Sequence, residues 1–143
     1  MICVDASLAA KWVLTEADRD LALYLYTQSH DAGEAVIAPP FLPVEVTNAI
    51  WRRVARGFIN RAEAEERLRL FLEFEVELAG PPGLYQAALG LADRFSRPAV
   101  YDVHYVALAQ IAGCDLWTAD QRLLNALGGQ LAFVRPLADF QPR

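Results

Sequence analysis

The sequence predicts an α/β fold, in which a mainly parallel sheet of four or five strands is flanked by helices. Short apolar runs alternate along the chain with longer helical segments, and this alternation is typical of a parallel sheet. The apolar runs are nearly continuous, as expected of strands that are buried on both faces. With 143 residues and a hydrophobic content of 55%, the chain is long enough to bury a core, and one domain is expected over residues 1–143.

Two strands and four helical segments are expected in the first half of the chain. Pro43 suits the first turn of the third helix, which Gly57 ends. Asn60 and Glu63 form a capping box that starts the fourth helix. The strands are expected at 2–4 and 35–38, and the helices at 7–14, 16–33, 43–56 and from Asn60 onward.

The second half is expected to add three strands and three helices. Gly113 offers the left-handed conformation that ends a helix, and the pair Gly128-Gly129 marks a turn. An alternation of apolar and charged residues indicates a short edge strand at 74–78. The other strands are expected at 115–118 and 131–134, and the helices at 84–95, from Asp102 to Gly113, and at 121–127.

Charge and cysteine content narrow the class of protein. The net charge of −5 argues against a nucleic-acid binder with a broad basic face, although six arginines fall between positions 52 and 69. No apolar run approaches the ~20 residues of a membrane span, and the N-terminal residues MICVDAS do not resemble a signal peptide. Cys3 and Cys114 lie in apolar segments and are expected to be thiols in a reducing compartment. A cytoplasmic protein without a membrane partner is therefore expected.

Four carboxylates are expected to meet at one edge of the sheet. Asp5 and Asp120 follow the ends of two predicted strands, and Glu45 lies in the first turn of a helix that follows a third. The helix that begins at Asp102 carries the chain roughly 15 Å away from this edge, and the strand 115–118 carries it roughly 13 Å back. Asp102 and Asp120 are therefore expected near the same edge. In such sheets, ligands bind beyond the carboxyl ends of the strands.

Each of these acids alone is readily explained as a helix cap, but four together favour a bound cation. Like charges ~4 Å apart repel by roughly 4 kcal/mol at an effective dielectric constant of about 20. No lysine stands in these motifs to neutralise them, and the nearest candidate cation is Arg52, two turns from Glu45. His104, two residues after Asp102, points to a different face of the helix and is expected to pack rather than to bind a ligand. Carboxylate oxygens suit Mg²⁺ or Mn²⁺, which activate water and stabilise the charge of an in-line phosphoryl displacement. The pattern predicts metal-assisted hydrolysis of phosphodiester bonds.

Other polar residues are candidates for supporting roles. Ser7 and Thr118 lie close in sequence to Asp5 and Asp120, where they would orient water or hydrogen-bond a carboxylate, although a local turn bond explains each equally well. Asp115 begins the strand that Asp120 follows, so it is expected to lie over about 10 Å from the cluster and is excluded. The helix face of Glu45 also carries Asn48, Arg52 and Arg56.

Four segments, in this order and spacing, resemble the PIN domain, in particular the VapC-type toxins of toxin–antitoxin pairs. They read VDAS, PVEVTNAIWR, YDVHYVALAQIAG and LWTADQRLL, and the resemblance spans Val4 to about Leu137. It implies a type II toxin endoribonuclease that hydrolyses RNA with a metal-activated water. It also implies that the catalytic, metal-holding residues are Asp5, Glu45, Asp102 and Asp120, and that the cofactor is Mg²⁺ or Mn²⁺.

The resemblance further implies an RNA substrate, a cognate antitoxin and a homodimer. Arg52, Arg53 and Arg56 are candidate contacts for the RNA backbone. An apolar groove among the early helices would seat an antitoxin helix, with Trp12, Tyr24 and Trp51 as candidate contacts.

Two other interpretations remain open from the sequence. One is a PIN-type nuclease for RNA processing or DNA that has no antitoxin. The other is a non-catalytic dimeric binding module, whose acids are helix caps or an inert metal site. A receiver-type aspartyl-phosphate domain is disfavoured, because VDAS lacks a second nearby acid and no lysine follows a later strand.

Overall fold

The protein is built around a five-stranded sheet in which all strand neighbours are parallel. The structure is a computed structural model that describes residues 1–143. The strand order is β3-β2-β1-β4-β5, so β1 lies at the centre of the sheet. The predicted α/β class and the mainly parallel sheet are confirmed. The strands are β1 (Ile2–Val4), β2 (Val36–Ala38), β3 (Glu77–Leu78), β4 (Asp115–Thr118) and β5 (Val134–Pro136).

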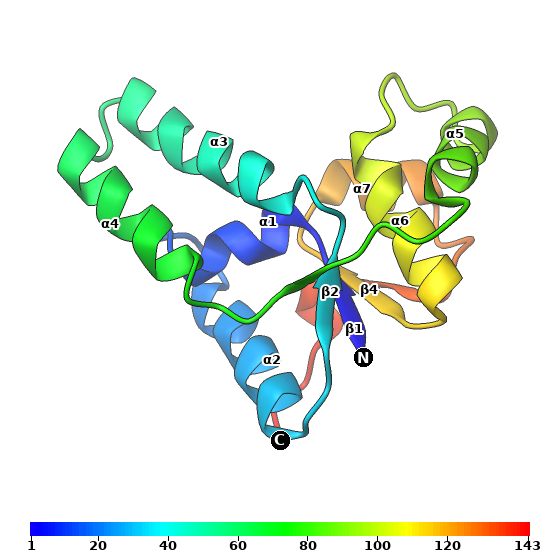
Figure 1. Ribbon diagram of the computed structural model, residues 1–143, viewed down its shortest axis with the longest axis horizontal. Coiled ribbons are helices and arrows are strands. Elements are labelled where there is room, and N and C mark those ends of the chain that lie inside the picture. Colours follow the sequence, from blue (N-terminus) through cyan, green and yellow to red (C-terminus); the bar gives the residue numbers. More distant parts are fainter.

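Helices cover both faces of the sheet. Figure 1 shows α1 to α4 on one side of the central strands and α5 and α6 on the other. α6 is the most deeply buried helix, since it packs against β1 and β4 on one side and against α5 on the other. The helices are α1 (Ala6–Ala9), α2 (Arg19–Asp31), α3 (Leu42–Ala55), α4 (Arg61–Phe71), α5 (Leu84–Arg94), α6 (Tyr101–Ala112) and α7 (Gln121–Leu127), with the 3-10 turns η1 (Ala10–Trp12) and η2 (Leu137–Asp139).

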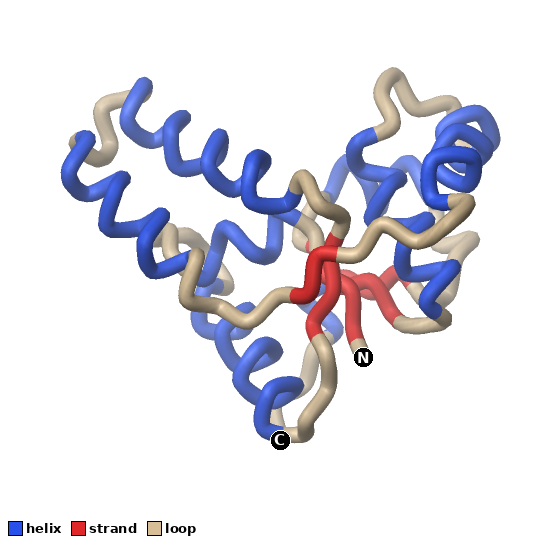
Figure 2. Tube along the Cα trace, viewed as in Figure 1, coloured by secondary structure: helices blue, strands red, loops and turns tan.

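The α3–α4 hairpin projects away from the sheet, as the tube in Figure 2 shows. Gly57 takes a left-handed φ of 76° at its turn. The predicted capping box starts α4, because Asn60 accepts a hydrogen bond from the backbone N–H of Glu63 while the Glu63 side chain accepts from Asn60. On its exposed surface Arg69 pairs with two glutamates of α4 and its C-terminal turn. Most of this charge is therefore a solvated helical surface.

An aromatic cluster around Trp12 holds the base of this hairpin against α2. The Trp12 ring stacks on Phe71 and Phe74 and packs against Tyr26, with ring centroids 4.8 to 6.4 Å apart. Its indole N–H donates to the Ala22 carbonyl at 3.2 Å. Trp12 is only 2% exposed, so it is part of the core and does not present a surface to an antitoxin helix, contrary to expectation.

The last strand lies further along the chain than predicted. It covers β5 rather than 131–134, because the chain is still turning after its two glycines, and the Val134 N–H donates to the Leu131 carbonyl. The register pairs Leu116 with Val134. β5 includes Pro136, which has no N–H and is tolerated because β5 is an edge strand.

Several other boundaries shift by a few residues. The predicted helix 7–14 is α1 followed by the turn η1, and α2 begins later than expected, at Arg19. The edge strand expected at 74–78 is reduced to β3, and α6 begins one residue before Asp102. The strand 115–118 and the helix 121–127 have the predicted bounds.

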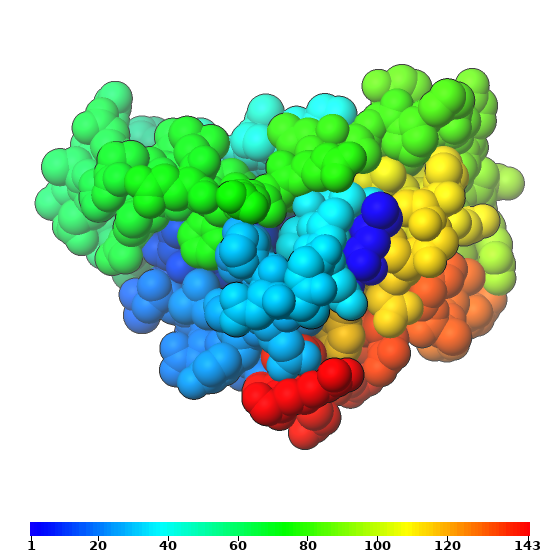
Figure 3. Space-filling model, turned by 60° about the horizontal axis from the view of Figure 1, so that its bottom comes forward, coloured from blue at the N-terminus to red at the C-terminus, as the bar shows by residue number.

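The two ends of the chain lie away from the edge at which the parallel strands end, and neither cysteine forms a disulfide. The C-terminal residues lie along α2 (Figure 3), where the backbone N–H of Arg143 donates to Gln28. Cys3 and Cys114 are free thiols, Cys3 fully buried and Cys114 partly so. None of the helices is both long and apolar enough to span a membrane.

The Trp12 cluster predicts a large difference between two tryptophan substitutions. Trp12→Ala should lower the free energy of unfolding by about 3–5 kcal/mol, because it removes a buried ring and its hydrogen bond. Trp51→Ala is the matched control, since Trp51 is 55% exposed on α3, and should change stability by less than about 1 kcal/mol. Urea unfolding of the two variants measures the difference. Equal effects would contradict the anchoring role of Trp12.

Candidate active site

The structure brings the four predicted carboxylates to the same edge of the sheet. Asp5 directly follows β1, and Asp120 follows β4 after one residue. Glu45 lies in the first turn of α3, which follows β2, and Asp102 lies in the first turn of α6. The charges of Asp5, Asp102 and Asp120 all raise the pKa of the Glu45 carboxyl, which places the four within electrostatic range.

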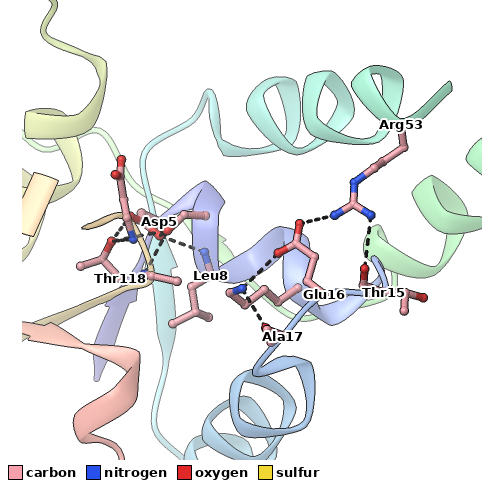
Figure 4. Close-up of polar contacts among 11 residues, drawn as sticks. Asp5, Leu8, Thr15, Glu16, Ala17, Arg53 and Thr118 are labelled. Atoms are coloured by element: carbon pink, nitrogen blue, oxygen red, sulfur yellow. Dashed lines mark hydrogen bonds and ion pairs between the residues drawn. The ribbon is translucent and has the colours of Figure 1, made fainter. Parts of the chain in front are cut away.

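Asp5 is a buried carboxylate, 5% exposed, held by donors from two elements. Its Oδ1 accepts from the backbone N–H of Leu8 at 3.0 Å and from the Ser7 hydroxyl at 2.6 Å. Its Oδ2 accepts from the Thr118 hydroxyl at the end of β4, as Figure 4 shows. Asp5 is thus both the N-cap of α1 and a fixed carboxylate at the sheet edge.

Ser7 and Thr118 also hold the loop after β4. The backbone N–H of Ala119 donates to Ser7 Oγ, and that of Asp120 donates to Thr118 Oγ1, each at 3.0 Å. The two hydroxyls lie 3.4 Å apart. They therefore connect Asp5 to the backbone that carries Asp120.

The carboxylates at this edge are held at an energetic cost. Burial raises the pKa of Asp5 to about 6, although the hydrogen bonds from Ser7, Thr118 and Leu8 oppose the change. Burial also raises the pKa of Glu45, and the neighbouring acids raise it further. A bound cation would offset this cost, because it favours the charged form of every carboxylate near it.

Tyr105 is a residue of the site that sequence reasoning missed. Its hydroxyl reaches from the buried face of α6 to Glu45 and donates to Oε1 at 3.1 Å. The signal was available in the sequence, because Tyr105 lies three residues after Asp102 and so on the same side of the helix. Tyr105 fixes the orientation of the Glu45 carboxylate.

Arg97 is the second residue that was missed, and it corrects the expectation about nearby cations. Its guanidinium contacts Asp102 Oδ2 with Nε at 3.1 Å and with a terminal nitrogen at 2.7 Å. The cation paired with the site is therefore Arg97, in the loop before α6, and Arg52 makes no ion pair there. The sequence shows an arginine five residues before Asp102. It does not show the loop conformation that directs the Arg97 side chain toward that carboxylate.

Asp120 caps the last helix. Its Oδ1 accepts from the backbone N–H groups of Arg122 and Leu123, at 2.9 and 3.2 Å. These bonds leave Oδ2 free of contacts with the helix start. Asp120 therefore has one oxygen committed to α7 and one available to a ligand.

A cleft of about 380 Å³ opens beside these acids, between α1, α3 and the loop after β4. Glu45, Asn48 and Arg52, which share one face of α3, all line it. Ser7 and Asp120 form part of the opposite wall. Of the four carboxylates, Glu45 and Asp120 are thus reached from solvent through an opening that also carries a cation and an amide.

The three candidate RNA-contacting arginines lie in different surroundings. Arg52 lines the cleft, whereas Arg56 is exposed at the C-terminal end of α3. Arg53 is engaged inside the protein, because its guanidinium contacts Glu16 at 2.7 Å and the Thr15 carbonyl at 3.2 Å (Figure 4). Lys11 contacts the same Glu16 at 3.1 Å.

Two polar residues that the sequence set aside lie outside the cluster. Asp115 is at the opposite end of β4, where it pairs with Arg135 at 3.5 Å. His104 is buried, with its Nδ1 2.6 Å from the Val100 carbonyl, and it packs against Phe41. The expectations for both residues agree with their surroundings.

The donor set fits a hard divalent ion by its chemistry. All four groups offer carboxylate oxygens, which Mg²⁺ and Mn²⁺ prefer. Asp5, Glu45 and Asp120 form no ion pair, so their charge is not compensated by the protein. No three acidic, histidine or cysteine side chains in the structure are close enough together to hold one ion. The fourth acid, Asp102, is paired with Arg97.

Comparison with known proteins relates nearly the whole chain to one family. A family model described as the PIN domain matches residues 2–128. Ribonuclease VapC3 of Pyrobaculum aerophilum is 30% identical over 127 residues, which cover 85% of this chain and 91% of the relative. The crystal structure of PAE2754 from Pyrobaculum aerophilum covers 96% of this chain and 90% of its own, with a TM-score of 0.67 and 25% identity.

A second solved structure shares the fold at lower identity. It is VapC20 of Mycobacterium tuberculosis, described as a sarcin–ricin loop cleaving toxin. The match covers 95% of this chain and all of that chain, with a TM-score of 0.66 and 18% identity. The shared fold includes the elements that carry the four acids.

The raised pKa of Asp5 predicts how stability depends on pH without metal. The folded protein keeps the Asp5 proton up to about pH 6, whereas the unfolded chain loses it near pH ~4. Between these values the folded state binds more protons, so the free energy of unfolding falls as pH rises. Asn at position 5 cannot ionise. The free energy of unfolding of Asp5→Asn, relative to that of the wild type, should therefore rise by about 2 kcal/mol between pH 4 and pH 7.

Urea unfolding in EDTA at the two pH values measures this effect. Asp115→Asn is the control, because Asp115 lies at the other end of β4. The same pH dependence in the wild type and in Asp5→Asn would show that Asp5 does not hold its proton in the fold.

Proposed function

The chain belongs to the PIN domain family, and on that basis we propose that it is a metal-dependent endoribonuclease toxin of a type II toxin–antitoxin system. The observation that carries this proposal is the placement of four carboxylates from four elements at one edge of the sheet, three of them without an ion pair and two of them, Glu45 and Asp120, lining an open cleft. The similarity of this chain to a protein named as a ribonuclease supports RNA as the substrate.

We assign the metal to the four carboxylates Asp5, Glu45, Asp102 and Asp120, and the ion to Mg²⁺ or Mn²⁺. When bound, the ion supplies Lewis-acid chemistry that activates water and stabilises the charge of phosphoryl displacement. Ser7 and Thr118 hold the Asp5 carboxylate, and Tyr105 holds that of Glu45. The protein thereby keeps two of the four groups oriented before substrate arrives.

The RNA backbone is proposed to enter along the exposed face of α3. Arg52 and Asn48 line the cleft next to Glu45, and Arg56 extends the same face toward the hairpin turn. Arg53 has a structural role instead, since Glu16 and Thr15 occupy its guanidinium. A few local cations are sufficient for backbone contact, so the net charge of −5 is compatible with an RNA substrate.

A cognate antitoxin and a second copy of the chain are the proposed protein partners, and the cytoplasm is the proposed compartment. Tyr24 and Trp51 are 60% and 55% exposed, as apolar contacts for a partner helix require. We treat residues 1–143 as one nuclease domain, because β5, beyond the family match, pairs with β4 and completes the sheet.

Cleavage assays test the proposed function directly. Asp5→Asn should reduce RNA cleavage by roughly 100-fold or more, because loss of a supporting residue alone typically costs 10- to 100-fold and Asp5 is a proposed direct ligand. EDTA should abolish cleavage, and Mg²⁺ or Mn²⁺ should restore it. Asp115→Asn should cleave like the wild type. Expression of the wild type, but not of Asp5→Asn, should arrest growth.

Two outcomes would contradict the proposal. One is cleavage that persists in EDTA after both Asp5 and Glu45 are replaced. The other is the absence of any antitoxin gene next to the gene of this protein, which would favour a processing nuclease. Sequencing of RNA ends after brief induction identifies the substrate.

The different surroundings of Arg52 and Arg53 predict different effects on RNA binding. In the Asp5→Asn background, Arg52→Ala should weaken RNA binding and lower the slope of log affinity against log salt by about 0.7, the value for one lost contact with single-stranded RNA. Arg53→Ala should leave this slope unchanged and lower stability by up to about 1 kcal/mol, through loss of the half-buried pair with Glu16. Fluorescence anisotropy and urea unfolding distinguish the two. Identical salt slopes for both variants would contradict the assignment.

A further inference from the structure

Arg97 is the only cation in the structure that forms an ion pair with any of the four carboxylates. Lys11 and Arg53 both pair with Glu16, and Arg61 and Arg69 of α4 pair with glutamates of the hairpin. Arg97 alone contacts a member of the cluster, Asp102. The three other acids of the same region have no such partner.

Both carboxylate oxygens of Asp102 have hydrogen-bond partners within the protein. Two nitrogens of Arg97 converge on Oδ2, and Oδ1 accepts from the backbone N–H of Val103 at 2.8 Å. The Arg97 and Asp102 side chains are 19% and 24% exposed, so salt screens the pair less than a surface pair. Asp102 therefore has a counter-charge, and a hydrogen bond to each oxygen, without any metal.

The loop before α6 fixes the backbone of Arg97. The Arg97 N–H donates to the Ala92 carbonyl at 2.8 Å, and the Ser96 N–H donates to the Asp93 carbonyl at 3.2 Å, which is a Schellman motif at the end of α5. Ser96 takes the left-handed φ of 51° that this motif needs and that glycine normally supplies. Pro98 then restricts Arg97 to an extended conformation. A non-glycine residue in this conformation is strained, and such strain tends to persist at functional sites.

A divalent ion and Arg97 would use the same carboxylate. Two cations on one carboxylate repel each other, so the affinity of each is lowered by the presence of the other. Arg97 already holds Asp102 Oδ2 with two nitrogens, so an ion that used this oxygen would have to displace the guanidinium. The metal-loaded and Arg97-paired arrangements of Asp102 are therefore in competition.

We propose that Arg97 is a built-in counter-cation that holds Asp102 in the metal-free protein and competes with the divalent ion for its carboxylate. This inference rests on the proposed function, because it concerns the same metal site. Arg97 is a positioning residue that acts through Asp102. It stabilises the fold when no metal is bound, and it sets the metal concentration at which the site fills.

Metal affinity tests this proposal independently of catalysis. Arg97→Gln should bind Mn²⁺ about 5- to 10-fold more tightly than the wild type in isothermal titration at pH 7, since the competing charge is removed. Its melting temperature without metal should fall, and its gain in melting temperature at saturating Mn²⁺ should exceed that of the wild type. Arg97→Lys keeps the charge but loses the two-nitrogen contact, so its Mn²⁺ affinity should lie between the two.

Arg94→Gln is the matched control, because it removes the same charge from an exposed arginine three residues away that pairs with no acid. Its Mn²⁺ affinity should equal that of the wild type. Two results would overturn the proposed competition. One is unchanged Mn²⁺ binding in Arg97→Gln, and the other is binding weakened by the 10- to 100-fold that is typical when a metal ligand loses an orienting partner. If Arg97→Gln does not fold, Arg97→Lys decides by the same comparison. A wild type that binds no Mn²⁺ would overturn the proposed function itself.

Discussion

The central strand of this sheet ends on a carboxylate that the fold buries, and much of the surrounding structure accommodates that charge. Asp5 takes hydrogen bonds from α1 and from the end of β4, so the group that is most costly to bury also joins two elements. Burial still raises its pKa to about 6. A residue that kept these hydrogen bonds but could not ionise would avoid this cost near neutral pH. The charge of Asp5 is therefore a cost to the fold when no cation is bound.

The positions of the four acids could be predicted because they depend on local patterns and one general rule. Each lies just after a strand or in the first turn of a helix, and parallel strands bring such positions to one edge. Arg97 and Tyr105 could not be placed in this way. The direction of Arg97 depends on the left-handed Ser96, and the contact of Tyr105 depends on where α6 lies relative to the start of α3. The last strand begins later than predicted because the apolar run at 131–134 lies in a turn that ends with the hydrogen bond from Val134 to Leu131.

Adjacent arginines on α3 show how much depends on neighbours that are distant in sequence. Arg52 and Arg53 look equivalent in the chain, but one faces the cleft and the other faces the loop between η1 and α2. Net charge conceals the same distinction. The protein is acidic as a whole, yet its cleft presents cations and carboxylates side by side, which is a suitable arrangement for a metal and a phosphate backbone together.

The Arg53–Glu16 pair has a consequence for the shape of the cleft. α3 is held at its start by the contact between Glu45 and Tyr105, and near its other end by the contact between Arg53 and Glu16. Lys11 joins Glu16 to η1, so the second contact spans the two walls of the opening. A helix fixed at two points along its length cannot tilt freely about either. The Arg53–Glu16 pair at the far end of the opening therefore helps to set the distance between α3 and η1, and so the width of the entrance.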